Sequence, residues 1–478
     1  MSKQKVTDIC YIISHGFAAR MLLQTDLILK LTQQQFSVAI ITPDPEDANL
    51  LPLKNLPNIA VYGADMKQTI WDDDYNVKRM YYLEDIKSNP VLWEKHLYGI
   101  KYTKSKHPWK RIRPFVYYPI SKLIKQFPGI RERFKKKESS YLISERAQEL
   151  IEKINPKVVV STYPVNYLEA KCLFAAKESG RETVIHLLSW DNVTSKGIFP
   201  VIPDQFIAWG KVMADEMVSY YQVSKEKIHT CGVPHFDQHV NVKDSDGYIS
   251  IIKELGLSPI KPYIFVAMSS PRFAPHEIDI IEWMAQGVRE NIFGAETQLV
   301  IRPHPQNVQG VMGDSSWLAR LQKIEGERVA VDYPKLNSSK VRWSMKKSDM
   351  DRLSHLLNGC VVCINSGSTV SIDALVIGKP VILTSFDGDK KLNYWKSARR
   401  LVDYPHQKKF VEMGGAEVVS DYKGLENTIN LYIENPNRRI EKRNHALSME
   451  CYKSDGKATE RVVTTMLQIV KELDTSNG

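Results

Sequence analysis

Polar side chains that could hold a phosphate group occur twice in the second half of the sequence, each time directly after an apolar run. The first stretch is IRPHP (301–305), in which Arg302 and His304 each lie next to a proline that restricts the backbone to an extended loop. A guanidinium and an imidazole on a stiff loop suit an anionic ligand. We predict that Arg302 and His304 bind phosphate, although a histidine after a strand is more often structural.

The second stretch, CINSGSTVSIDALVIGKPVI (363–382), is typical of a strand, a turn, a helix and another strand. Its turn contains Asn365, Ser366, Gly367, Ser368 and Thr369. Free N–H groups and the positive end of the following helix attract an anion there, and hydroxyl groups add donors. Plain capping of the helix is the alternative, but it needs one hydroxyl and this turn has three. One turn later, Asp373 is placed to accept a hydrogen bond from a ribose or sugar hydroxyl.

A third stretch, SWDNVTSKG (189–197), follows an apolar run in the first half and could move a proton. Asp191 is a candidate general base for a hydroxyl nucleophile, and Lys196 is a candidate phosphate contact. His15, in IISHGFAARM after the first expected strand, is a second candidate base. An Asx-turn at Asp191 and a hydrogen-bonded loop residue at His15 are the structural alternatives, and the residues alone do not choose between the two bases.

Two other motifs resemble metal sites only superficially. The stretch WDDD (71–74) begins a charged amphipathic segment, so we expect its aspartates to cap a helix. Cys360 and Cys363 fit alternate positions of a buried strand, with no second Cys or His pair nearby. The sequence therefore predicts no bound metal.

The elements that position these residues follow an alternation of short β-branched runs with longer amphipathic stretches, which is typical of parallel sheets covered by helices. The expected strands are 8–14, 36–43, 58–63, 157–164, 183–189, 205–210 and 227–232 in the first half and 263–270, 297–305, 328–332, 360–368, 379–385 and 416–421 in the second. Helices are expected at 423–440 and 446–473.

A chain of 478 residues has room for two cores. We predict an α/β protein with two tandem Rossmann-like, doubly wound domains facing a cleft. The first domain spans 1–238, a linker spans 239–250, the second domain spans 251–440, and a C-terminal helix spans 441–478.

The net positive charge lies in one segment. Of the net charge of +10, residues 101–137 contribute thirteen Lys or Arg against the single acid Glu132. Aromatic residues are interleaved with these charges, as in segments that lie at an anionic bilayer. We predict that this segment, inside an insertion at about 100–140 of the first domain, contacts an anionic membrane surface. A solvated helical insertion is the alternative, and nucleic acid is not expected because no nucleic-acid motif accompanies the patch.

The N-terminal sequence MSKQKVTDICYIISHGFAARM has too short an apolar stretch for a signal peptide or a membrane span. Scattered cysteines in apolar segments are typical of reduced, buried thiols. We therefore expect a cytoplasmic protein that binds peripherally at the inner face of the cell membrane.

These motifs together resemble those of a known family. Two Rossmann-like halves with NSGSTVSIDALVIGKPVI in the second are similar to the GT-B glycosyltransferase superfamily, whose usual acidic residue falls on Asp373. The pair His304–Pro305 with the later pair Ser368–Thr369 resembles bacterial CMP-sugar transferases, in which those motifs hold the donor phosphate. The pattern W-x-x-x-T-x-K-G (190–197) is more distantly similar to a loop of CDP-glycerol glycerophosphotransferases.

This resemblance implies a metal-independent transferase that moves a sugar from a nucleotide sugar, with a CMP-sugar favoured and a UDP-sugar possible, to a cell-surface polysaccharide or lipid-linked glycan. No cofactor besides this substrate is implied. The alternatives are a CDP-polyol phosphotransferase, a non-hydrolysing nucleotide-sugar epimerase and a non-catalytic scaffold of a polysaccharide-synthesis complex. Epimerases of that type carry a glycine pair and paired glutamates at the corresponding turn, and GSTVSIDA has neither. The donor, the acceptor, the anomeric outcome and the oligomeric state stay open.

Overall fold

Each half of the sequence folds around its own parallel sheet. The computed structural model describes residues 6–101, 106–243, 245–309, 313–341 and 343–476. Tyr102 and Lys104 of the basic segment, and the first five residues used for the N-terminal prediction, lie outside the described residues. The described chain divides into a first unit of residues up to Cys231 with 339–341 and 460–476, and a second unit made of the rest.

The sheet of the first unit has seven strands in the order β3-β2-β1-β4-β5-β6-β7, and all its strand pairs are parallel. Its strands are β1 (Thr7–Ile12), β2 (Val38–Thr42), β3 (Ile59–Gly63), β4 (Pro156–Ser161), β5 (Glu182–His186), β6 (Gln205–Ala208) and β7 (Ile228–Thr230). The order reverses between β1 and β4, which is where ligands bind in open α/β sheets.

The sheet of the second unit has six parallel strands in the order β10-β9-β8-β11-β12-β13. Its strands are β8 (Tyr263–Ala267), β9 (Gln298–Arg302), β10 (Val329–Val331), β11 (Val362–Asn365), β12 (Val381–Thr384) and β13 (Glu417–Val419). The order reverses between β8 and β11.

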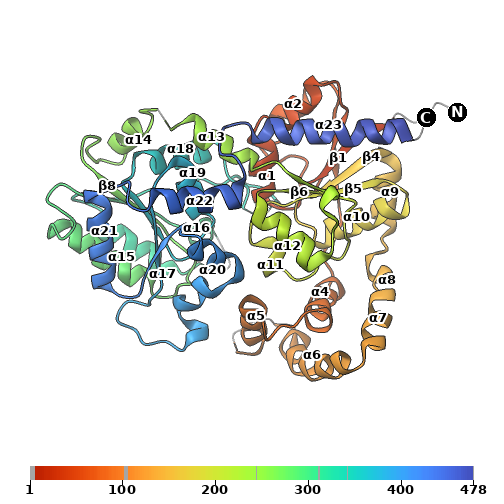
Figure 1. Ribbon diagram of the computed structural model, residues 1–478, viewed down its shortest axis with the longest axis horizontal. Helices are drawn as coiled ribbons and strands as arrows, with labels where there is room; N and C mark the ends of the chain where they lie inside the picture. The colour runs from red at the N-terminus through yellow and green to blue at the C-terminus, as the bar shows by residue number, and fades with distance from the viewer. Residues whose placement is uncertain (1–5, 102–105, 244, 310–312, 342, 477–478) are drawn as a thin grey trace. The chain divides into compact units, whose positions relative to one another are not determined.

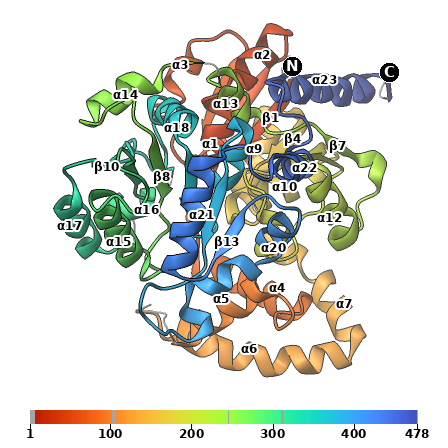
Figure 2. The ribbon, with the colours of Figure 1, turned by 60° about the vertical axis from the view of Figure 1, so that its left-hand side comes forward.

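Helices connect the strands of each sheet (Figures 1 and 2). Those in the first half of the chain are α1 (Gly16–Leu23), α2 (Leu27–Gln33), α3 (Leu51–Lys54), α4 (Ile70–Leu83), α5 (Pro90–Lys101), α6 (Pro108–Gln126), α7 (Pro128–Lys136), α8 (Ser139–Leu142), α9 (Glu145–Ile154), α10 (Tyr167–Glu178), α11 (Asn192–Ser195) and α12 (Lys211–Tyr221). Those in the second half are α13 (Asp237–Asn241), α14 (Tyr248–Glu254), α15 (Glu277–Arg289), α16 (Pro305–Gln309), α17 (Ser315–Ile324), α18 (Lys347–Gly359), α19 (Val370–Ile377), α20 (Pro405–Glu412), α21 (Tyr422–Glu434), α22 (Ile440–Cys451) and α23 (Ala458–Ser476), with short 3-10 helices at Lys225–Lys227, Pro234–Phe236, Tyr394–Lys396 and Ala398–Asp403.

The thirteen strands predicted from the sequence are all present among the described residues, and the prediction of two doubly wound sheets is confirmed. It succeeds because buried parallel strands are short, continuous β-branched runs with turn residues on either side. The buried core of the first sheet includes Ile9, Ile40, Val158 and Val184, and that of the second includes Ile264, Ile301 and Ile364.

The C-terminal part differs from the expected single helix at 446–473. α22 ends at Cys451 because Tyr452 has a positive φ of 58°, and Gly456 has a φ of 73° in the turn that follows. Asp455 accepts a hydrogen bond from the N–H of Lys457 at 3.1 Å and so shapes this turn. α23 then packs its apolar side, including Val462, Met466 and Ile469, into the core of the first unit.

The expected linker at 239–250 is not an open connection. The chain leaves the first unit at Cys231 and enters the second at Gly232. α13 and the start of α14 occupy most of the expected linker, and both belong to the second unit. A polar and turn-rich composition does not exclude helices whose few apolar residues are buried by tertiary contacts.

One buried carboxylate ties together the loops at the switch point of the first sheet. Glu169, in the first turn of α10, is fully buried and accepts hydrogen bonds from the hydroxyls of Ser14 at 2.5 Å and Ser161 at 2.6 Å. It also accepts from the N–H groups of Thr162 and Tyr163, each at 2.8 Å. Burial raises the pKa of Glu169, and these hydrogen bonds oppose that shift. The glutamate therefore joins the loops after β1 and β4.

The substitution Glu169→Ala tests this role. It leaves two backbone donors and two hydroxyls, buried or partly buried, without their acceptor, so we expect the free energy of unfolding to fall by about 3 kcal/mol. Thermal and urea unfolding of the variant measure the loss. The matched control is Glu178→Ala at the exposed end of the same helix, which we expect to have a small effect. An equal loss in both variants would contradict the role of Glu169.

Candidate functional site

The carboxyl edge of the second sheet brings together the loops that follow β8, β9 and β11. His304 follows β9, the turn 366–369 follows β11, and Ser269 and Ser270 follow β8. β8 lies between β9 and β11 in the sheet, so the three loops are neighbours at the switch point. This is the position at which open α/β sheets bind ligands.

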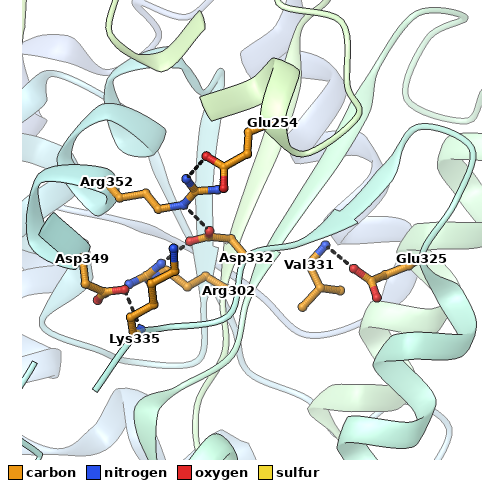
Figure 3. A network of polar contacts seen from close by, with 8 residues as sticks. All are labelled: Glu254, Arg302, Glu325, Val331, Asp332, Lys335, Asp349 and Arg352. Atoms are coloured by element: carbon orange, nitrogen blue, oxygen red, sulfur yellow. Dashed lines mark hydrogen bonds and ion pairs between the residues drawn. The ribbon is translucent and has the colours of Figure 1, made fainter. Parts of the chain in front are cut away.

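Arg302 has protein partners on both sides of its guanidinium group (Figure 3). One end pairs with Asp332 and the other with Asp349 at 2.5 Å, and all three side chains are buried. Arg352 joins the network, with its Nε 2.5 Å from Asp332. A buried guanidinium needs such partners to offset its loss of hydration. Arg302 was expected to bind phosphate, but in the structure it fixes the end of β9, which leads into the loop of His304.

His304 is a partly buried, neutral hydrogen-bond donor. Burial lowers the pKa of His304 to about 4, so the ring is uncharged at neutral pH. Its Nδ1 accepts a hydrogen bond from the N–H of Gln306 at 3.1 Å. In the neutral ring the proton is therefore on Nε2. The histidine can donate one hydrogen bond to a ligand without adding positive charge.

Asn365 satisfies part of the turn after β11, where the sequence predicts free N–H groups. Its Oδ1 accepts from the N–H groups of Gly367 and Ser368, both at 2.8 Å. Gly367 has a φ of 102°, which glycine adopts without strain. Those two amides are thus used within the protein, and an anion at this turn would rely on hydroxyl groups instead.

The three hydroxyls of the turn have different surroundings. Ser366 is buried and donates to Glu277 at 2.6 Å, while its oxygen lies 2.8 Å from the hydroxyl of Thr384. Ser368 and Thr369 are partly exposed. Thr369 makes no side-chain cap to α19, so its hydroxyl is not used to start the helix. Ser368 and Thr369 are therefore the hydroxyls that can reach a ligand.

Glu277 is the counterpart of Glu169 in the second unit. It lies in the first turn of α15 and accepts from the N–H of Ser269 and the hydroxyl of Ser366, both at 2.6 Å. Burial raises its pKa to about 7, although both hydrogen bonds act in the opposite direction. Glu277 thus links the loops after β8 and β11, and it titrates near neutral pH.

Several buried polar atoms at this edge have no hydrogen-bond partner within the described part of the chain. They are the hydroxyl of Ser270, the side-chain oxygens of Gln306 and Asn307, and both amide atoms of Gln407. Gln407 lies against Gly367, where an added Cβ would be 3.5 Å from its amide nitrogen. Unpartnered buried polar atoms are costly, so they indicate a site completed by a ligand or by water.

Asp373 does not face this site as a ligand group. It is 1% exposed, and its carboxylate lies 2.7 Å from Nε2 of His239. The Nδ1 of His239 lies 2.8 Å from the hydroxyl of Ser354, which donates to the carbonyl of Met350. All three side chains are buried, so this serine, histidine and aspartate hold α13, α18 and α19 together. The hydrophobic helix α19 is buried on every side rather than on one, so Asp373, which belongs to it, lies in the core.

In the first unit, Asp191 organises its own loop. Its carboxylate accepts from the hydroxyls of Ser189 at 2.6 Å and Ser195 at 2.5 Å, and it lies 3.0 Å from Nζ of Lys196. The expected phosphate contact Lys196 is therefore engaged with the expected base. Both side chains remain partly exposed.

His15 caps α1. Its Nδ1 accepts from the N–H of Phe17 at 3.2 Å, and the ring lies 5.6 Å from that of Tyr163. With Nδ1 as the acceptor, a neutral His15 carries its proton on Nε2. In this arrangement the outer nitrogen donates a proton rather than accepting one.

Glu169 and Glu277 are not among the residues predicted from the sequence, and Asn365 is predicted only as part of the turn after its strand. A local signal for the glutamates does exist, because each lies in the first turn of a buried helix, eight residues after a strand-end serine. For Asn365 the signal is its place at the end of a strand, two residues before Gly367. None of these signals shows which donors the side chain meets.

Within the described residues, no group of three or more His, Cys, Asp or Glu is arranged to hold a metal ion. None of the described helices is both long enough and apolar enough to cross a membrane.

No protein-family model matches the sequence, and no curated protein matches it either. Solved structures do match. A candidate UDP-N-acetylglucosamine 2-epimerase from Listeria monocytogenes has a TM-score of 0.57 and 13% identity over 98% of both chains. MnaA of S. aureus with UDP has a TM-score of 0.55 and 13% identity over 97% of both chains. The UDP-GlcNAc 2-epimerase of Neisseria meningitidis with UDP-GlcNAc has a TM-score of 0.53 and 12% identity, over 97% of this chain and all of that one.

These identities are low enough to establish the fold alone. The chain has the GT-B fold. The similarity extends over the residues of both units.

The raised pKa of Glu277 gives a testable pH dependence. The folded state holds this proton up to about pH 7, whereas an unfolded glutamate releases it near pH 4.5. The folded state therefore binds the proton more tightly, and stability falls as the pH rises from 4.5 through 7. Glu277→Gln mimics the protonated form, so its stability relative to wild type should rise across this window by up to about 3 kcal/mol.

Thermal unfolding at intervals between pH 5 and pH 8 measures this effect. The control is Glu290→Gln at the exposed end of α15, which should follow the wild-type profile. A constant difference between Glu277→Gln and wild type at every pH would contradict the shifted titration.

Proposed function

We propose that this protein is a glycosyltransferase of the GT-B superfamily that takes a sugar from a nucleotide-activated donor. The observation that carries the proposal is the group of unpartnered buried polar atoms beside His304 and the turn 366–369 at the switch point. In the proposed site, Nε2 of His304 and the hydroxyls of Ser368 and Thr369 donate to the donor phosphate. Because the histidine is neutral, these contacts orient the phosphate by hydrogen bonds rather than by charge.

The cation that offsets leaving-group charge is proposed to be Arg272. Arg302 is committed to Asp332 and Asp349, which leaves it the role of positioning the loop of His304. Arg272 is partly exposed on the loop after β8, beside the switch point. Developing negative charge on a leaving phosphate is the feature that a transferase without a metal has to stabilise.

For the acceptor, Asp191 is proposed as the base in preference to His15. Nδ1 of His15 caps α1, so its outer nitrogen is a donor in the neutral ring. Asp191 keeps a partly exposed carboxylate next to Lys196. The proposed acceptor is a surface polysaccharide or a lipid-linked glycan at the inner face of the cell membrane, with a CMP-sugar favoured over a UDP-sugar as the donor.

Nucleotide binding and transfer can be tested together. We expect CMP to raise the thermal midpoint of the protein more than GDP or CDP does. If the donor is a UDP-sugar instead, UDP should do so. His304→Ala and Ser368→Ala should each reduce the shift and lower transfer by about tenfold or more, since each removes a hydrogen bond to a charged group. Ser316→Ala, an exposed serine at the start of α17, is the control. Full activity in both site variants would refute the phosphate assignment.

The second candidate is a UDP-N-acetylglucosamine 2-epimerase. Its support is the match to such enzymes over 97% or more of the chain. Against it stands the turn GSTVSIDA, which has no paired glutamates. Incubation with UDP-N-acetylglucosamine and no acceptor, followed by product separation, distinguishes the two. We expect no 2-epimer, and its appearance would replace the transferase proposal.

A scaffold without catalysis is tested by Asp191→Asn. This change keeps the size of the side chain and weakens its proton affinity, so transfer should fall by about a hundredfold or more while the nucleotide-induced thermal shift is retained. Unchanged transfer in this variant would remove Asp191 from the reaction, and transfer absent from wild type with every donor would favour the scaffold.

A further inference from the structure

The helical insertion between β3 and β4, residues 70–142, is anchored on one side and unpartnered on the other. Thr69 and Asp72 form a capping box that starts α4, which confirms the capping predicted for the aspartate run. The next two aspartates hold α6. Asp73 pairs with Arg113 at 2.7 Å, and Asp74 accepts from the hydroxyl of Tyr117 at 2.7 Å.

This anchoring decides which side of α6 is buried. Tyr117 packs with Tyr81, Ile86 and Leu92 in a small core of the insertion. Burial alone would raise the pKa of Asp74, but hydrogen bonds from Tyr117, Lys78 and Trp109 lower it. The carboxylate thus stays charged and fixes the rotation of the helix about its axis.

The opposite side of α6 carries an exposed apolar stripe. Phe115 is 60% exposed, Leu123 is 55% exposed and Ile112 is 51% exposed. Residues spaced three and four apart share one side of a helix, so these three lie in line. We call this the α6–α7 stripe, and its exposed members are Ile112, Phe115, Pro119, Ile120, Leu123, Phe127 and Ile130.

Positive charge borders the stripe. On α6, Arg111 and Lys122 lie on one flank of the apolar residues, and α7 adds Arg133 and Lys136. These four side chains are exposed, and within the described residues none of them forms an ion pair. Across 101–137 the net charge is +12. In Figures 1 and 2, α6 and α7 lie at the end of the first unit opposite to α23.

A lipid bilayer with anionic headgroups fits this surface. Its headgroups complement the basic flank, and its acyl boundary accepts aromatic and aliphatic side chains from a helix lying in the interface. An acidic protein partner would match the charge, but not a stripe of seven exposed apolar residues along two successive helices.

The insertion is also bonded to the loop that contains Asp191. Arg79 of α4 donates to the carbonyls of Ile198 at 3.0 Å and Phe199 at 2.9 Å. Lys95 of α5 donates to the carbonyl of Ser195 at 2.6 Å, and Asn89 donates to that of Thr194 at 2.8 Å. The position of the insertion therefore sets the position of this loop.

We propose that the α6–α7 stripe inserts into an anionic bilayer and that the insertion thereby presents the loop 189–199 to a membrane-anchored acceptor. The docking step stands without the proposed function. Only the presentation of an acceptor rests on it. Apolar insertion holds the protein at the surface, and the basic flank selects anionic lipid.

Vesicle sedimentation tests the docking step. Wild type should bind vesicles of phosphatidylglycerol and phosphatidylcholine and should bind pure phosphatidylcholine at least about tenfold more weakly. Phe115→Ser with Leu123→Ser should lower binding to the anionic vesicles by about tenfold or more, at unchanged thermal midpoint. Arg133→Gln with Lys136→Gln should lower it and reduce its salt dependence. The matched control is Tyr220→Ser, a 53% exposed aromatic on α12 of the same unit.

Insertion itself is measured by fluorescence. Phe115→Trp should show added quenching by brominated acyl chains, and Tyr220→Trp should not. Binding that is unaffected by the double serine change, or equal on both lipid mixtures, would overturn the proposal. A third outcome would also overturn the proposal: the wild type forms a concentration-dependent dimer, the double serine variant does not, and neither binds vesicles. A second copy of the chain would then cover the stripe.

Failure of this proposal is distinguishable from failure of the proposed function. His304→Ala should bind vesicles as wild type does. The double serine variant should keep its nucleotide-induced thermal shift and its transfer to a soluble acceptor, while losing transfer to an acceptor embedded in vesicles.

Discussion

Two buried glutamates hold the loops on which the candidate chemistry depends. In each unit the sheet reverses its order between two central strands, and one glutamate bridges the loops after those strands. Glu169 and Glu277, each in the first turn of a buried helix, accept hydrogen bonds from both loops. Each carboxyl group satisfies several donors at once, and losing a buried acceptor is costly. The two switch points are thus built in the same way.

The polar residues around Glu277 divide into those that hold the site and those that remain available. Asn365 uses its side chain to satisfy the turn, and Arg302 is neutralised by two aspartates. His304, Ser368 and Thr369 retain groups that can donate. A site that is assembled before its ligand arrives avoids reorganisation when charge develops. Which residues can contact a ligand therefore depends on whether their hydrogen-bond donors are already used within the protein, and not only on residue type.

In the insertion of the first unit, too, the contacts made by some residues decide which others remain exposed. Each of three successive aspartates has its own role. Asp72 caps α4, Asp73 pairs with Arg113, and the buried carboxylate of Asp74 accepts a hydrogen bond from Tyr117. Once these contacts set the rotation of α6, its other face has to be exposed. Bonds from Arg79 and Lys95 to the loop of Asp191 connect this surface to the acceptor side of the proposed reaction.

By itself the sequence determined the two parallel sheets, the insertion and the capping by Asp72, since each follows from local periodicity and spacing. Cys360 and Cys363 are buried as expected, but only Cys363 lies in the strand to which both were assigned, and Cys360 ends α18. The tertiary structure decided the partners. Asp332 and Asp349 take Arg302, and His239 takes Asp373, from positions 30, 47 and 134 residues away in the chain. No local pattern encodes such distant pairs, because a side chain and its partner meet only when the strands and helices between them have packed.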